Sequence, residues 1–216
     1  MPQVYADEYV TIELLPALGP QANNCYILRP ADGSGPMVVD APAGFEAVLD
    51  ALGAARERVS HVLVTHSHFD HWGGYDVMRA AISAPVYAGA EETNLAESRE
   101  LRRLADGEEL RLGGTTVRVI HTPGHTPGSI CLLVGGALLS GDTLFPGGPG
   151  FSRSHEALQQ EIASITSRLY ALPDETLVLP GHGDGTTIGA SKAEYAVFAS
   201  RPHLADLHGD VLWVES

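Results

Sequence analysis

Residues 64–74 read VTHSHFDHWGG, and this stretch decides how the rest of the chain is interpreted. It places four side chains with metal-binding groups within six positions, directly after an apolar run: His66, His68, Asp70 and His71. Polar groups crowded at the end of a buried strand are costly unless a cation organises them. In an extended or turning backbone, His66 and His68 point to the same side and can chelate one metal ion. Asp70 and His71, displaced around the turn, can reach a second ion, so the stretch predicts a site for two.

Three later stretches each place one more candidate ligand at the end of a predicted strand. His125 lies in HTPGHTPGS (121–129), where the Pro and Gly residues fix a rigid turn that can aim an imidazole. Asp142 follows the apolar run 137–139, and a carboxylate there can bridge two cations. His182 lies in LPGHG, just past a further strand. The sequence therefore offers enough ligands for two complete sites.

The first half of the chain alternates short strands with helices. Apolar runs at 9–14, 24–28 and 37–40, separated by Gly and Pro turns, predict a β-meander. An i, i+3, i+4, i+7 stripe predicts an amphipathic helix that packs on a sheet through Phe45, Val48, Leu49 and Leu52. The other predicted elements are a strand at 61–65, a helix at 75–81, a short strand at 86–87 and a helical stretch at 90–104.

The second half repeats this order of elements. Strands are predicted at 109–112, 115–121, 129–134, 137–140 and 176–179, with a helix at 190–200. Before the last strand, another helix carries on one face Leu158, Ile162, Ile165 and Leu169. No flexible linker separates the halves. We therefore expect one α+β domain of the α/β type over residues 1–216, with similar halves at approximately 1–105 and 106–216, in which two packed sheets are covered by helices outside.

Composition limits the partners of the protein. The formal net charge of −14 repels polyphosphate and anionic lipid, so we expect no nucleic acid or membrane partner. The first ten residues lack a signal-peptide pattern and no apolar run reaches membrane-spanning length, which predicts a cytoplasmic protein. Cys25 and Cys131 lie in apolar runs and are expected to be buried thiols. The oligomeric state is left open, a homodimer included.

The motifs, in this order, resemble the metallo-β-lactamase fold superfamily, whose members carry H-x-H-x-D-H, a later His, a bridging Asp and a last His. The match runs from Thr65 to Gly183. The resemblance implies a four-layer αβ/βα sandwich with two metal ions at one edge between the sheets. It assigns one ion to His66, His68 and His125, and the other to Asp70, His71 and His182, with Asp142 bridging both. Imidazole and carboxylate ligands suit Zn²⁺, and also Mn²⁺ or Fe.

Within the superfamily, the runs TPGHTPGS (122–129) and GDTLF (141–145) resemble hydroxyacylglutathione hydrolase, or glyoxalase II. The resemblance implies hydrolysis by a hydroxide shared between the cations, with Asp70 as the catalytic residue that orients the hydroxide and shuttles its proton. The chain departs from glyoxalase II after residue 145, where it continues PGGPG, and 34 residues follow His182, so the glutathione-binding helical domain is not expected. The expected substrate is a small ester, thioester or lactone, with pocket walls from Phe69, Trp72 and Phe145.

Other functions of the same fold remain open. Persulfide dioxygenases hold a single iron with two His and one Asp, here His66 or His68, His125 and Asp142. A nuclease conflicts with the net charge of −14 and with the absence of the insertion that such enzymes carry. A non-catalytic binding module conflicts with seven filled ligand positions.

Overall fold

The computed structural model describes residues 2–93, 95 and 101–216. Within this part of the chain, the first sheet has the order β1-β2-β3-β4-β5-β6-β7, with strands Gln3–Ala6, Val10–Leu18, Asn23–Pro30, Met37–Val39, His61–Val64, Val86–Gly89 and Leu101–Leu104. The second sheet has the order β15-β14-β11-β10-β9-β8. In chain order its strands β8, β9, β10, β11, β14 and β15 are Glu109–Leu112, Thr115–His121, Ile130–Val134, Ala137–Gly141, Leu177–Pro180 and Thr186–Thr187.

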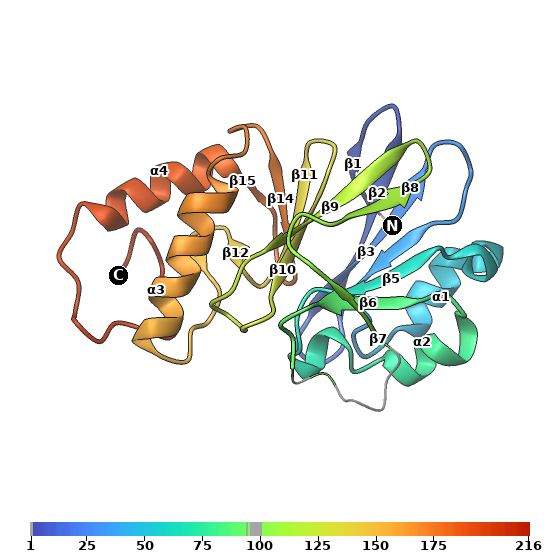
Figure 1. The fold of residues 1–216 in the computed structure, drawn as a ribbon, viewed down its shortest axis with the longest axis horizontal. Coiled ribbons are helices and arrows are strands. Elements are labelled where there is room, and N and C mark those ends of the chain that lie inside the picture. Colours follow the sequence, from blue (N-terminus) through green and yellow to red (C-terminus); the bar gives the residue numbers. More distant parts are fainter. Residues whose placement is uncertain (1, 94, 96–100) are drawn as a thin grey trace.

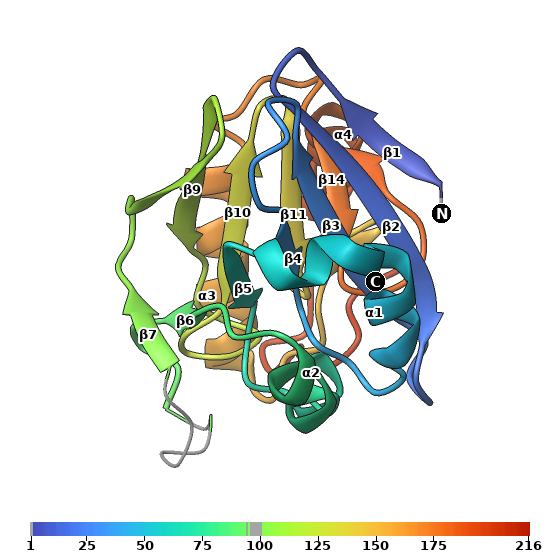
Figure 2. The same cartoon turned by 90° about the vertical axis from the view of Figure 1, so that its right-hand side faces the viewer.

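The helices lie outside the two sheets (Figure 1). Helices α1 (Glu46–Leu52) and α2 (Tyr75–Ala81) cover the first sheet, and the 3₁₀ helix η1 (Gly53–Arg58) continues α1. Helices α3 (His155–Ser164) and α4 (Ile188–Ala199) cover the second sheet, and a π-helical turn, η3 (Ile165–Leu169), extends α3. Figure 2 shows α1 and α2 on the side of the first sheet that faces away from α3 and α4.

Three apolar clusters hold these four layers together. Strand β5 shows why the layers form, because its alternate side chains point to opposite faces of the sheet. Leu63 lies in the cluster between the two sheets, whereas Val62 and Val64 pack toward α1 and α2. A third cluster, which includes Leu158 and Trp213, fills the space between the second sheet and its helices. The expected αβ/βα sandwich and its outer helices are confirmed.

The predicted helical stretch at 90–104 is wrong over the residues that the structure describes. Residues 90–93 form a turn, and Leu101–Leu104 is β7, which pairs in parallel with β6 so that Leu104 lies opposite Gly89. Residues 94 and 96–100 lie outside the described residues. The open edge of β6 supplies backbone partners, and Leu104 enters the core between the sheets at 1% exposure. Pairing with β6 therefore decides the conformation of Leu101–Leu104.

Several other predicted features match the structure closely. Strands β2 to β4 form the expected meander, and the predicted helix at 75–81 coincides with α2. Cys25 and Cys131 are buried free thiols. Strands β1 and β15 and the small hairpin of β12 (Leu144–Phe145) and β13 (Gly148–Pro149) were not predicted from the sequence. No helix in the described ranges is long and apolar enough to cross a bilayer.

Parallel pairing brings strand ends from both sheets to one edge. Strands β4 and β5 run parallel in the first sheet, and β11 and β14 run parallel in the second. Backbone hydrogen bonds join the sheets at this edge: Ile130 N donates to Thr65 O, and Asn24 N donates to Gly181 O, at 3.0 and 2.7 Å. Loops that follow β4, β5, β11 and β14 therefore meet between the sheets.

Candidate metal centre

The seven predicted ligands converge at this edge. His66 Nε2 lies 3.2 Å from His68 Nδ1 and 3.2 Å from His125 Nε2. Close by, His71 Nε2 lies 3.2 Å from His182 Nε2. The structure therefore brings together residues 59 and 111 positions apart in the chain, as the sequence predicted.

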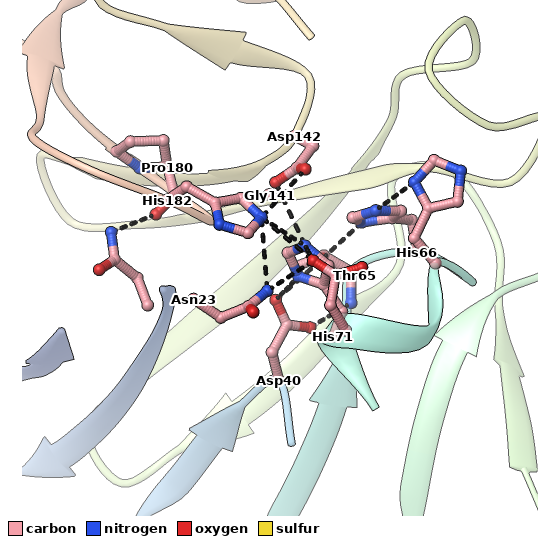
Figure 3. A network of polar contacts seen from close by, with 12 residues as sticks. Asn23, Asp40, Thr65, His66, His71, Gly141, Asp142, Pro180 and His182 are labelled. Carbon is pink, nitrogen blue, oxygen red and sulfur yellow. Dashed lines mark hydrogen bonds and ion pairs between the residues drawn. The ribbon is translucent and has the colours of Figure 1, made fainter. Parts of the chain in front are cut away.

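The carboxylates of Asp70 and Asp142 complete the arrangement. Asp70 Oδ2 lies 3.4 Å from His71 Nε2 and 3.3 Å from His182 Nε2. Asp142 Oδ1 lies 3.4 Å from His71 Nε2, while Asp142 Oδ2 lies 3.4 and 3.7 Å from the Nε2 atoms of His182 and His125. Asp142 thus reaches both groups of imidazoles (Figure 3).

Each ligand candidate follows an element that fixes its position. His66 comes two residues after β5, and Asp70 lies in the 3₁₀ turn η2 (Phe69–His71). His125 lies in the Pro- and Gly-rich turn between β9 and β10. Asp142 directly follows β11, and His182 comes two residues after β14. The strand ends of both sheets therefore supply the site, and only a short turn separates each ligand from rigid structure.

Oxygen acceptors fix the outer nitrogens of three imidazoles. His71 Nδ1 lies 2.8 Å from Asp40 Oδ2, His125 Nδ1 lies 2.9 Å from Phe151 O, and His182 Nδ1 lies 3.0 Å from Gln21 O. Because carbonyl and carboxylate oxygens only accept, each Nδ1 carries the proton in the neutral imidazole and Nε2 presents a lone pair inward. Nitrogen ligands about 2.0–2.1 Å from a tetrahedral zinc lie roughly 3.3 Å from one another, close to the spacing observed here.

The space between the donors also fits cations. Asp142 Oδ1 is buried with no hydrogen-bond partner among the described residues. A Cβ at Gly181 would lie 2.3 Å from that oxygen and 2.6 Å from His71 Cε1, so only glycine leaves the room that is present. An unpartnered buried carboxylate oxygen is costly, and a cation at this point would satisfy it.

The electrostatics of the site divide the imidazoles into two kinds. Burial lowers the pKa of His66 well below its ordinary value and that of His125 to about 4, so both are neutral and suited to ligate a metal. Burial also lowers the pKa of His182, but hydrogen bonds to Asp142 and Asp70 outweigh it and raise the pKa to about 9. The carboxylates thus attract a positive charge that a bound cation would supply instead.

The sequence did not identify Asp40, which holds His71 in place. Asp40 is 2% exposed and accepts hydrogen bonds from Thr65 N at 2.8 Å and Thr65 Oγ1 at 3.0 Å, in addition to its contact with His71. Its φ of 66° lies in the left-handed region, where Asp and Asn are the most tolerated residues after Gly. The available signal was an aspartate directly after a buried strand, the same placement as Asp142.

Asn23 is a second residue that the sequence did not single out. Its Nδ2 donates to Asp70 Oδ2 at 2.8 Å and lies 3.3 Å from His182 Nε2, and the residue is 1% exposed. An asparagine next to the start of an apolar run was the only indication in the sequence. Asn23 fixes the orientation of the Asp70 carboxylate.

Replacing Asp40 with asparagine is expected to weaken metal binding about 10- to 100-fold. The asparagine amide offers one acceptor oxygen where Asp40 accepts three contacts, so a donor would face His71 Nδ1 and favour a proton on the inward nitrogen. Competition with a chelator of known affinity measures the change. Asp50, exposed on α1, provides the matched control D50N, and equal affinities of the two variants would contradict the role of Asp40.

Two cavities open beside the seven side chains. The Arg153 cavity, of about 360 Å³, is lined in part by His68, His125 and Arg153. The Phe145 cavity, of about 300 Å³, is lined in part by His125, Phe145 and Leu212. Phe145 therefore lies where a pocket wall was expected. Neither Phe69 nor Trp72 lines these two cavities: Phe69 is 68% exposed, and the indole N–H of Trp72 donates to Ser67 O.

Fold and site together define a metal-binding sandwich of two sheets with the ligands at one edge. The family model described as the Metallo-beta-lactamase superfamily matches residues 18–182. The chain belongs to this superfamily, as the sequence motifs suggested.

Three similar proteins show the range of its relatives. A hydroxyacylglutathione hydrolase from Alkalilimnicola ehrlichii is 43% identical over 67% of this chain, which spans 55% of that relative. "Probable polyketide biosynthesis zinc-dependent hydrolase BaeB" from Bacillus velezensis is 30% identical over 78% of this chain and 76% of the relative. The solved structure of TTHA1623 in a di-iron-bound form is 31% identical, covers 82% of this chain and 96% of its own, and has a TM-score of 0.70.

Proposed function

We propose that this protein is a hydrolase that cleaves a small ester, thioester or lactone at a centre of two divalent cations. The observation that carries the proposal is the convergence of five imidazoles and two carboxylates from both sheets, whose ligand atoms form three groups, each with its atoms within 4.8 Å of one another. The donor set lacks thiolate and suits zinc, with iron or manganese as alternatives. One relative is named as zinc-dependent and another as di-iron-bound, which supports zinc or iron as the metal.

The ligand assignment follows the three donor groups of the structure. His66, His68 and His125 would hold one cation, and Asp70, His71 and His182 would hold the other, with Asp142 shared between them. Bound cations of this kind lower the pKa of a water toward about 7 and polarise an acyl carbonyl. We expect a small-molecule acyl substrate rather than nucleic acid, because the net charge of −14 opposes a polyanion.

Asp70 is the proposed catalytic residue. Hydrogen bonds from His182 and Asn23 outweigh burial and hold its pKa far below the ordinary value, so the carboxylate is ionised at neutral pH. Its side chain is 20% exposed, whereas that of His71 is fully buried, so Asp70 borders the open side of the centre. From there it orients the attacking water, accepts its proton and returns that proton to the leaving group.

The number of converging side chains supports the hydrolase over the persulfide dioxygenase. A mononuclear iron site needs His66 or His68, His125 and Asp142. It gives no role to Asp70, His71 and His182, whose ligand atoms form a group of their own. Asn23 and Asp40 hold this second group in place, which supports its use.

The proposal is tested by metal analysis and a substrate panel. Protein purified without added metal, and protein loaded with zinc, manganese or iron, is assayed on an ester, a thioester and a lactone. We expect two metal ions per chain and hydrolysis of at least one substrate. One iron per chain with oxygen consumption on a persulfide would establish the dioxygenase instead, and full metal occupancy with no turnover would end the hydrolase proposal.

A further inference from the structure

Arg153 lies at the rim of the metal centre, in the Arg153 cavity. Its Nη2 lies 3.2 Å from His68 Nε2, the ring nitrogen opposite the one that faces His66. Among the residues that the structure describes, no carboxylate oxygen comes within 4.0 Å of this guanidinium.

The tautomer of His68 makes this contact significant. His68 Nδ1 faces the ligand group, 3.2 Å from His66 Nε2, so His68 would bind a cation through Nδ1. A neutral imidazole that ligates through Nδ1 carries its proton on Nε2. The guanidinium has only donors, and so the contact at 3.2 Å then places two donors against each other. Among the described residues no acceptor oxygen is recorded for either N–H group, so an acceptor from outside the chain can bind between them.

We propose that Arg153 and the Nε2–H of His68 bind a carboxylate of the substrate, next to the scissile acyl bond. This inference rests on the proposed hydrolase function and names its substrate class. A planar guanidinium fork matches a carboxylate, which can accept from both donors. A phosphate dianion fits less well, because Glu156 lines the same cavity and the protein is strongly acidic.

The Phe145 cavity indicates what lies on the other side of the scissile bond. His125 lines both cavities, so they flank the ligand groups. The Phe145 cavity presents apolar side chains from two parts of the chain: Phe145, Pro146, Pro149, Phe151, Val211 and Leu212. The substrate therefore has an apolar arm in the Phe145 cavity and a carboxylate arm in the Arg153 cavity, with the acyl carbon between them.

A matched pair of esters tests this assignment. Hexanoyloxyacetate carries the carboxylate, and hexanoyloxyacetamide replaces it with a neutral amide of nearly the same shape. Charge-assisted hydrogen bonds contribute about 1.5–3 kcal/mol, so zinc-loaded wild-type protein should prefer the carboxylate by roughly 10- to 100-fold in kcat/KM. In R153Q the preference for the carboxylate over the amide should disappear, with the KM for the carboxylate rising more than the KM for the amide. R118Q, at an exposed position of β9, removes the same charge and should keep the preference.

Binding of uncleaved analogues separates this inference from the hydrolase proposal. Calorimetry on the zinc-loaded protein compares N-hexanoylglycine, N-hexanoylglycinamide and the phosphonate N-hexanoylaminomethylphosphonate. We expect the carboxylate to bind most tightly, and R153Q, but not R118Q, to lose the advantage.

Each outcome decides one of the two claims. No hydrolysis of either ester by the wild-type protein would count against the function, and the binding data would still decide the role of Arg153. Equal binding of carboxylate and amide, or equal binding of the carboxylate by wild type and R153Q, would overturn the inference while leaving the hydrolase intact. If the phosphonate binds more tightly than the carboxylate, the proposed carboxylate is wrong and Arg153 binds a phosphate group instead.

Discussion

Replacing Asp142 with asparagine is expected to lower kcat for the best acyl substrate by about 10³-fold, which corresponds to about 4 kcal/mol of lost transition-state stabilisation. Asp142 is the carboxylate whose oxygens approach both ligand groups, at 3.4 Å from His71 and from His182 and at 3.7 Å from His125. Asparagine keeps the shape but removes the negative charge shared by two cations. Steady-state kinetics and elemental analysis of the purified variant measure the effect.

The metal content should fall together with the rate. We expect fewer than two metal ions per chain in D142N, because the neutral amide leaves the positive charges of two cations uncompensated. D50N makes the same chemical change on the exposed face of α1 and should keep both metal content and kcat. A D142N protein with two tightly held ions and wild-type kcat would show that Asp142 does not bridge the ions.

The seven ligand candidates were predictable because residues that bind a metal form recognisable short motifs in the sequence. Four of them lie within six positions, and the other three each follow an apolar run at a Gly-containing turn. Strand β5 supplies the reason: its buried residues end at Val64, so the polar side chains that follow must find partners at the sheet edge. The sandwich was predictable for a similar reason, since the order of strands and helices repeats.

Residues that act through these ligands were not predictable. Asp40 and Asn23 bond to side chains 31 and 47 positions away, and only the pairing of β3, β4 and β5 brings them there. Arg153 meets His68 across 85 positions. The helix predicted at 90–104 was wrong for the same reason. Pairing with the open edge of β6 decides the conformation of Leu101–Leu104. Contacts that depend on strand pairing cannot be predicted from the spacing of residues that are close in the sequence.

The second large effect is expected at Trp213, which anchors the last residues of the chain. Trp213 is fully buried. The centroid of its ring system lies 4.8 Å from that of Phe198 and 5.1 Å from that of Tyr195, and both of these residues are on α4. Its backbone N donates to Gly147 O at 2.7 Å. These contacts fasten the segment that carries Val211 and Leu212, two walls of the Phe145 cavity. Trp213 therefore links the packing of α4 to the shape of the proposed substrate site.

Trp213→Ala should lower the free energy of unfolding by about 3–5 kcal/mol, the cost of removing a large buried aromatic side chain. This is a large part of the roughly 5–15 kcal/mol that stabilises a typical domain, so the urea midpoint should fall clearly. Val214, 47% exposed beside it, provides the control V214A, which should stay within about 0.5 kcal/mol of wild type. Because Leu212 lines the Phe145 cavity, where the apolar arm of the substrate is proposed to bind, W213A should also raise KM for hexanoyl esters more than for acetyl esters. An unchanged urea midpoint would mean that the C-terminal segment does not unfold together with α4.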